Sequence, residues 1–154
     1  MTDFDWITYN KEYAEKDYIY ADWLKAAIKI LQPKTILEVG AGLQRNRKYI
    51  DDSIQYTGID LIDGHDLTEM ESYKYYDLVL STGFFCHIEP SKREQVMDFM
   101  THSGKYIIMI EPYTEKPEMH EWHGEKDKLW TVNPEMYQPI IFTRLKGGYS
   151  LAIF

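Results

Sequence analysis

Apolar and polar residues follow a helical spacing in two stretches of the first third of this chain. The segment 11–32 carries apolar residues at intervals of three and four and is followed by Pro33, which predicts one amphipathic helix. Those apolar residues are Trp23, Leu24, Ala27, Ile28 and Leu31. The stretch "LQRNRKYIDDSI", residues 43–54, predicts a second and more polar helix.

Short runs of apolar and β-branched residues predict four strands. They are "TILEV" (35–39), "YTGID" (56–60), "DLVLST" (77–82) and "YIIMIE" (106–111). Such runs are typical of parallel strands that are covered on both faces.

A third helix is predicted between the last two of these strands. It begins near Pro90, because Ser91 and Glu94 have the spacing of a capping box. Its predicted end is Gly104.

The C-terminal residues alternate around a turn sequence. "PIIFTRL" and "YSLAIF" are separated by "KGG", which predicts a β-hairpin over 139–154. Alternating strands and helices followed by a hairpin indicate the α/β class. The expected architecture is a Rossmann-like, mostly parallel sheet with helices on both faces and a C-terminal antiparallel hairpin.

Size and charge narrow the range of functions. The chain of 154 residues is expected to form one domain, 1–154, without a linker. A net charge of −8 makes nucleic acid an unlikely partner, and the basic stretch 43–48 is interpreted as a solvated helix face. The single cysteine, Cys86, suits a reducing cytoplasm, and no apolar run is long enough to span a membrane.

The stretch "TILEVGAGLQRN" (35–46) indicates a ligand site at the end of a strand. Gly40 and Gly42 allow the backbone to turn tightly and to approach a ligand closely. The dinucleotide pattern G-x-G-x-x-G would need a third glycine at the position of Arg45, which counts against an NAD-dependent oxidoreductase. The acid Glu38 suits a ligand with an amine or another positive group better than a pyrophosphate.

A second acid follows the second predicted strand. Asp60 comes 18 residues after Gly42, and a carboxylate at the tip of this strand can accept hydrogen bonds from both hydroxyls of a ribose. Glu38 and Asp60 together therefore describe a nucleoside that carries a cation nearby.

The ordered series of these motifs resembles the class I S-adenosylmethionine (SAM)-dependent methyltransferases. "ILEVGAG" is similar to their first motif, and "YTGID" to their second strand with its terminal acid. "YYDLVLSTGFFCHIEPSKREQVMDFM" followed by "GKYIIMIEP" resembles the fourth strand, helix and fifth strand, and "IIFTRLKGGYSLAIF" the last two strands. The resemblance runs from Thr35 to Phe154 and implies a small, single-domain member with SAM as cofactor.

The resemblance also implies roles for individual residues. The turn of Gly40, Ala41 and Gly42 would pass beneath the methionine part of the cofactor, and Glu38 would lie near its amino end. Further cofactor contacts are implied for residues after two other strands, namely Asp60 on the ribose, Leu61 and Ile62 on the adenine, and Thr82, Gly83 and Phe84 along the channel of the methyl group.

The region after Asp60 departs from the family pattern. Typical members run a helix and a third strand before an acid that contacts the adenine, whereas here Asp66 follows after only six positions. The helix is expected to be absent and the strand reduced to a stub at 65–68. Asp66 and Leu67 are the candidates for the adenine contact, and Asp63 competes with them.

Two residues are candidates for catalysis. His87 follows the strand 77–82 and Glu111 ends the strand 106–111, and either could take a proton from the acceptor. The alternative for His87 is a histidine that packs or caps beside the sheet. The Asn/Asp-Pro-Pro motif of base-modifying amino methyltransferases is replaced by "STGFF", so a small-molecule acceptor is expected. A cofactor-binding partner subunit without transferase activity, and a homodimer, stay open as alternatives.

Aromatic residues mark two further segments. The segment 1–32 is expected to supply a lid and the first helix, with Tyr9 and Tyr13 as lid candidates over the core 33–154. The segment 120–130 has no periodicity and is predicted as a substrate loop, in which Trp122 and Trp130 form either acceptor walls or a small core. His120 and His123 would suit a metal with Cys86 or His87, but no second ligand pair has zinc spacing, and no metal is expected.

Overall fold

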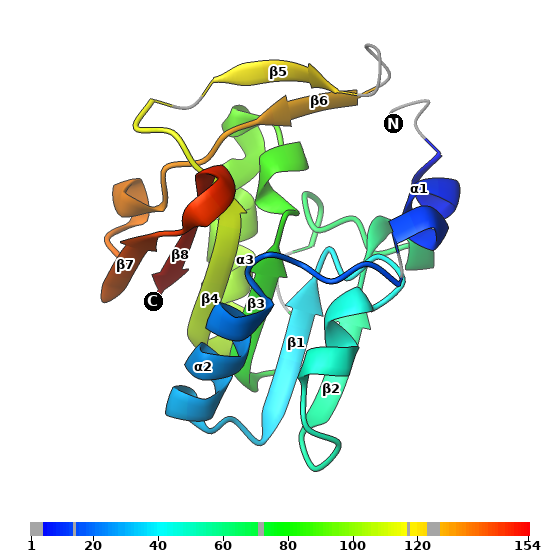
Figure 1. Ribbon diagram of the computed structural model, residues 1–154, viewed down its shortest axis with the longest axis vertical. Helices are drawn as coiled ribbons and strands as arrows, with labels where there is room; N and C mark the ends of the chain where they lie inside the picture. The colour runs from blue at the N-terminus through cyan, green and yellow to red at the C-terminus, as the bar shows by residue number, and fades with distance from the viewer. Residues whose placement is uncertain (1–4, 14, 71–72, 117, 123–126) are drawn as a thin grey trace.

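Six strands form one mostly parallel sheet in the computed structural model, which describes residues 5–13, 15–70, 73–116, 118–122 and 127–154. The strand order is β2-β1-β3-β4-β8-β7; the first four strands run parallel, and β8 and β7 are antiparallel (Figure 1). The strands are β1 (Thr35–Val39), β2 (Gln55–Ile59), β3 (Tyr76–Thr82), β4 (Gly104–Pro112), β7 (Ile141–Arg144) and β8 (Tyr149–Ile153). The predicted fold class, the four parallel strands and the C-terminal hairpin are therefore confirmed.

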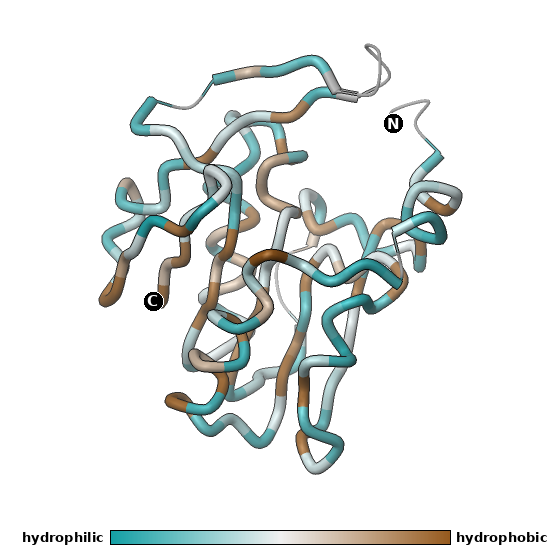
Figure 2. Tube along the Cα trace, viewed as in Figure 1, coloured by the Kyte–Doolittle hydropathy of each residue, from teal (hydrophilic) through white to brown (hydrophobic). Residues whose placement is uncertain are grey.

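Two helices cover the two faces of this sheet. Leu24 and Ile28 of α2 (Ala21–Leu31) share a buried cluster with Leu78 of β3. Phe99 of α3 (Arg93–Ser103) belongs to a second cluster that contains Val79. Neighbouring residues of a strand point to opposite faces, so each central strand contributes to both clusters. Apolar segments accordingly recur along the central strands, whereas the peripheral strand β5 is largely hydrophilic (Figure 2).

The prediction of a single helix over 11–32 is wrong. The chain forms α1 (Trp6–Tyr13) and, after a break, α2. In the break the backbone N–H of Tyr18 donates to the hydroxyl of Tyr49 at 3.1 Å, and the rings of Tyr18 and Tyr20 stack with centroids 4.6 Å apart. These tertiary contacts replace the helical hydrogen bonds that the local spacing would otherwise favour.

The helix predicted over 43–54 is reduced to a five-residue 3-10 helix, Arg45–Tyr49. Asn46 turns inward and is only 2% exposed, and Arg47 donates to the carbonyl oxygen of Ile50 at 2.7 Å. A buried polar side chain and a side chain that binds its own backbone both compete with a regular helix.

The strand stub predicted at 65–68 does not form. Residues Leu61–Asp63 make a 3-10 turn, and Asp66 then accepts hydrogen bonds from both the N–H and the hydroxyl of Thr68, at 2.9 and 2.7 Å. This Asx turn satisfies the backbone locally, so no pairing with β2 is needed. The expected reduction of the region after Asp60 is confirmed.

The helix near Pro90 begins as a 3-10 turn, Pro90–Lys92, which leads into α3. The expected capping box is absent, because α3 begins after Lys92 without a side-chain cap, while the predicted end at Gly104 is confirmed.

The loop predicted over 120–130 contains a hairpin instead. β5 (Met119–Trp122) and β6 (Asp127–Trp130) pair antiparallel and form a sheet of their own. In Figure 1 this hairpin crosses the end of the molecule toward which the arrows of β1 and β4 point. Among the described helices, none is long and apolar enough to cross a membrane.

Candidate functional site

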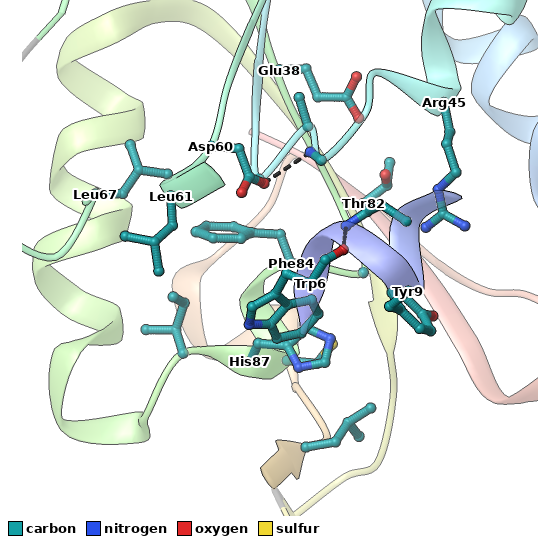
Figure 3. Close-up of a pocket in the computed structure, with 18 of the residues that line it drawn as sticks. Trp6, Tyr9, Glu38, Arg45, Asp60, Leu61, Leu67, Thr82, Phe84 and His87 are labelled. Carbon is teal, nitrogen blue, oxygen red and sulfur yellow. Dashed lines mark hydrogen bonds between the residues drawn. The ribbon is translucent and has the colours of Figure 1, made fainter. Parts of the chain in front are cut away.

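A cavity of about 870 Å³ lies at the carboxyl ends of β1, β2 and β3. The loops after these strands line it together with α1 and the end of β6 (Figure 3). In open α/β sheets this is the edge at which ligands bind. The cavity volume falls within the range of small-molecule sites in proteins.

The turn after β1 requires its two glycines. Gly40 and Gly42 have positive φ angles of 65° and 53°. A Cβ at Gly40 would come within 2.2 Å of the Phe84 ring, and one at Gly42 within 2.3 Å of Oδ1 of Asn10. The backbone between them, including Ala41, therefore forms part of the cavity wall without a large side chain.

Asp60 connects the end of β2 to this turn. Its Oδ2 accepts a hydrogen bond from the N–H of Gly42 at 2.8 Å, and its Oδ1 accepts one from the N–H of Ile62 at 3.0 Å. Each carboxylate oxygen keeps a further lone pair, so Asp60 can still accept hydrogen bonds from a ligand. Figure 3 shows the Asp60 carboxylate beside the glycine turn.

Glu38 belongs to a buried polar network. The side chain is 2% exposed; it accepts a hydrogen bond from Nδ2 of Asn46 at 2.6 Å and another from the hydroxyl of Tyr56. Nδ2 of Asn46 also donates to Oγ1 of Thr82 at 2.6 Å. Burial raises the pKa of Glu38 to about 7, although these hydrogen bonds act in the opposite direction. Asn46 thus brings together two residues that the sequence predicted separately.

The residues after β2 close the far end of the cavity. Leu61, Asp66 and Leu67, for which contacts with the adenine are predicted, line it, and His65 lines it as well. The Leu67 side chain is 3% exposed and is held by its packing, whereas the Leu61 side chain is 49% exposed and is accessible to a ligand. The described cavity lining does not include the predicted Ile62, which contributes only the N–H that Asp60 binds.

The loop after β3 carries Gly83, Phe84 and His87, all of which line the cavity. The His87 ring packs edge-on against Trp6 of α1, with centroids 4.8 Å apart. A catalytic candidate and the N-terminal helix therefore meet at the same wall (Figure 3).

Glu111 lies beneath this loop and is fully buried. Its Oε1 accepts hydrogen bonds from the Ser81 hydroxyl at 2.9 Å and from the N–H groups of Phe84 and Phe85 at 3.2 and 3.0 Å. Its Oε2 accepts the N–H of Cys86 at 3.1 Å, and burial raises the pKa of the carboxyl. Glu111 therefore holds the backbone of residues 84–86 in the loop after β3.

Aromatic side chains surround the mouth of the cavity. Tyr9 and Tyr13, the lid candidates, line it, as does Trp130 at the end of β6. The side chains of Trp122 and His123 lie outside the described part of the chain. His120 is exposed, and its Nε2 lies 3.9 Å from Oε2 of Glu118. No cluster of three or more metal-ligating side chains occurs among the described residues.

The sequence did not reveal three polar residues of the cavity, Asn10, Arg45 and Asn46. Asn10 belongs to no sequence motif, and the sequence predicts Arg45 and Asn46 as part of a solvated helix face. The only sequence feature that favours a buried Asn46 is its proximity to the glycine turn. Its neighbours share this proximity, so the sequence does not single Asn46 out.

Comparison with solved structures identifies the fold. No protein-family model and no curated protein matches the chain. Its architecture is that of the class I SAM-dependent methyltransferases.

Three structures illustrate this likeness. The Burkholderia thailandensis 1,6-didemethyltoxoflavin-N1-methyltransferase, solved with 1,6-didemethyltoxoflavin and S-adenosylhomocysteine, has a TM-score of 0.71 and 15% identity over 89% of this chain and 78% of its own. Human N-acetylserotonin methyltransferase in complex with SAM has a TM-score of 0.68 and 10% identity over 96% of this chain and 55% of its own. The DhpI–SAM–HEP complex has a TM-score of 0.63 and 11% identity over 96% and 92%.

Proposed function

We propose that this protein binds SAM in the cavity and transfers its methyl group to a small-molecule acceptor. The observation that carries the proposal is the hydrogen bond between the Asp60 carboxylate and the N–H of Gly42, because it joins an acid after β2 to a glycine turn after β1. The bound SAM of two proteins with the same fold supports the choice of cofactor.

The described residues fit this cofactor. Asp60 has lone pairs left for the two ribose hydroxyls, and Leu61 and Leu67 offer apolar surface to the adenine. A Cβ at Gly40 or Gly42 would strike Phe84 or Asn10, so this turn offers bare backbone, which suits close contact with the methionine part. Thr82, Gly83 and Phe84 line the cavity and would face the channel of the methyl group.

When bound, SAM supplies an electrophilic methyl group on a positively charged sulfur. The chain then has to hold an acceptor in line with that group and exclude water. Phe84, Trp130 and Tyr149 give the remaining cavity wall an aromatic character suited to a flat or apolar acceptor. His87, which lines the cavity, would accept a proton from the acceptor, and Glu111 would hold the loop that carries His87.

Calorimetric titration of the purified protein tests the cofactor assignment. SAM and S-adenosylhomocysteine are expected to bind, and NAD is not. Asp60→Asn is expected to weaken binding about tenfold or more, because one carboxylate oxygen is replaced by an NH₂ group. Asp98→Asn is the control, since Asp98 is an exposed acid of α3 that does not belong to the described cavity lining.

The outcomes separate the alternatives. A folded protein that binds neither SAM nor S-adenosylhomocysteine would overturn the proposal. Transfer of labelled methyl groups from SAM to small molecules of a deproteinised cell extract would support it. Binding without transfer, with transfer restored only by a second protein, would favour the partner-subunit alternative instead.

A further inference from the structure

Helix α2 carries more apolar surface than the sheet covers. Its residues Leu24 and Ile28 are buried against the sheet. Trp23 and Ile30 are 52% and 75% exposed, and Ala26 between them is exposed as well. Spacings of three and four residues place these three side chains on one side of the helix. A second apolar stripe of α2 therefore faces solvent.

The stripe continues beyond the helix. Ile19, which precedes α2, is 65% exposed, and a Cβ at Gly147, between β7 and β8, would come within 2.5 Å of its Cδ1. Ile141 of the edge strand β7 is half-exposed and pairs with Ile153, which is buried in the cluster under α2. Paired residues of neighbouring strands share a face, so Ile141 lies on the α2 side of the sheet. We call the exposed apolar residues of this side the α2 surface; they are Ile19, Trp23, Ala26, Ile30 and Ile141.

The α2 surface is separate from the cavity. None of its five residues belongs to the described cavity lining, so the proposed reaction does not use them. Figure 1 shows α2 well away from the β5–β6 hairpin, which contributes Trp130 to the cavity. Exposed apolar side chains that gather on one side of a protein mark an interaction surface, whereas scattered single ones do not.

Two opposite charges flank the stripe near its ends. Asp22 and Lys29 are seven residues apart, about two helical turns, and therefore lie on the same flank of α2. Within the described chain, Asp22 forms an ion pair of 3.6 Å with Lys25 and its side chain is 98% exposed, while Lys29 is exposed without an ion pair. When two copies of α2 pack antiparallel about a two-fold axis, Asp22 of each copy meets Lys29 of the other. Parallel packing would oppose like charges, so the stripe is complementary to a second copy in one orientation only.

The order of side chains along the stripe suits a close crossing of two helices. Ala26 lies near the middle, where the two-fold axis would pass, and its small side chain lets the helix axes approach. Trp23 of each copy would then pack near Ile30 of the other, so both large apolar side chains would lose their contact with water.

We propose that the α2 surface is the interface of a symmetric homodimer in which the two copies of α2 pack antiparallel across Ala26. This inference does not depend on the proposed function. The interface adjoins each cavity, because Tyr18 and Tyr20, on either side of Ile19, belong to the cavity lining.

Sedimentation equilibrium of the purified protein tests the dimer. A reversible equilibrium between a species of 18.3 kDa and one of twice that mass is expected, with a Kd in the micromolar range because the interface is small. Ile30→Glu should weaken the dimer at least about tenfold, since the new carboxylate would lie near Asp22 of the other copy. Ile7→Glu, at an exposed isoleucine of α1, should retain the wild-type equilibrium.

Exchange of the two charges tests the antiparallel arrangement. Asp22→Lys and Lys29→Asp should each weaken the dimer about tenfold, because like charges then meet at both ends of the crossing. The variant with both substitutions should return to within about threefold of the wild type, since opposite charges face each other again. Circular dichroism and thermal unfolding establish that each variant is folded.

A wild type that stays monomeric well above micromolar concentration would overturn the proposal, and so would a dimer that Ile30→Glu leaves intact. Failure of the double charge exchange to restore the dimer would refute the antiparallel arrangement. A monomer that floats with phosphatidylcholine vesicles, and no longer does so as Ile30→Glu, would assign the α2 surface to a membrane and overturn the dimer as well.

Discussion

Two buried carboxyl groups, Glu38 and Glu111, act in different ways although both lie at the end of a central strand. Glu38 accepts hydrogen bonds from the side chains of Asn46, which lines the cavity, and Tyr56, whereas Glu111 is bound mainly by backbone N–H groups of the adjacent loop. Protonation of Glu38 therefore affects residues of the cavity wall, whereas Glu111 determines the conformation of the loop after β3.

Glu38 is expected to make the protein less stable as the pH rises from about 4.5 to about 7. In this range the folded protein retains a proton that the unfolded chain has released, because the pKa of Glu38 rises from 4.5 to about 7 on burial. The loss amounts to on the order of 3 kcal/mol across the interval. Urea unfolding at several pH values should show a flatter pH dependence for Glu38→Gln than for the wild type. Glu69→Gln, which changes an exposed acid, should retain the wild-type curve; parallel curves for Glu38→Gln would contradict the prediction.

Glu111→Gln should destabilise the protein by about 1–3 kcal/mol, because the new NH₂ group would face the N–H of Cys86 and leave that donor unsatisfied. The loop would loosen, and ligand affinity should fall with it. The measurement is the free energy of unfolding in urea. Glu115→Gln, at an exposed acid that pairs with Arg144, should change the stability by less than about 0.5 kcal/mol. A neutral effect of Glu111→Gln would show that the loop does not depend on this carboxylate.

At the scale of elements, one buried arginine connects α3 to the chain that leaves β6. Arg93 is 3% exposed and donates to the carbonyl oxygens of Ile88, Trp130 and Thr131, at 3.0, 3.2 and 3.3 Å. Burial lowers its pKa. The loop of His87 and the wall that contains Trp130 are therefore held by the same side chain.

Arg93→Met should release this connection. The backbone amides of Thr131 and Val132, which donate to the carbonyl oxygens of Glu118 and Pro112, should exchange with solvent about tenfold faster or more. Hydrogen exchange followed by mass spectrometry checks this, with peptides of β3 as the internal reference. Arg47→Met should leave the exchange unchanged; an equally slow exchange in Arg93→Met would refute the role of the guanidinium.

The elements differ in how far the sequence predicts them. Strands β1 and β3 were predictable because Leu37 and Val79 belong to short, β-branched apolar runs of the kind that buried parallel strands carry. The helix boundaries were not, because Tyr18 and Asn46 are held by residues distant in the sequence. The same holds for the site: the spacing of Gly42 and Asp60 was visible in the sequence, but the environment of Arg45 depends on tertiary contacts.

For the molecule as a whole, one sheet separates two buried clusters that share no residue. Leu24 belongs to the cluster under α2, and Ile107 to the cluster under α3. Both clusters use side chains of the same strands, so the two faces are expected to unfold together as one cooperative domain.

Leu24→Ala should cost about 2–5 kcal/mol and Ile107→Val about 0.5–1.5 kcal/mol, and the double variant should equal their sum within about 0.5 kcal/mol. Circular dichroism and tryptophan fluorescence should report the same midpoint in every variant. Two separate transitions, each sensitive to only one substitution, would contradict a single domain.

Helix α1 and the β5–β6 hairpin lie outside the six-stranded sheet, yet both contribute to the cavity wall. The parts of the chain assigned to the cofactor follow the strands, whereas Trp6 and Trp130 belong to these added segments. Under the proposed function, a chimaera that exchanges the segment between Tyr113 and Val132, the residues that form an isolated bridge at its base, is expected to keep the proposed cofactor site and to change the range of acceptors. In such a scaffold, a segment at the rim can be exchanged while the sheet remains unchanged.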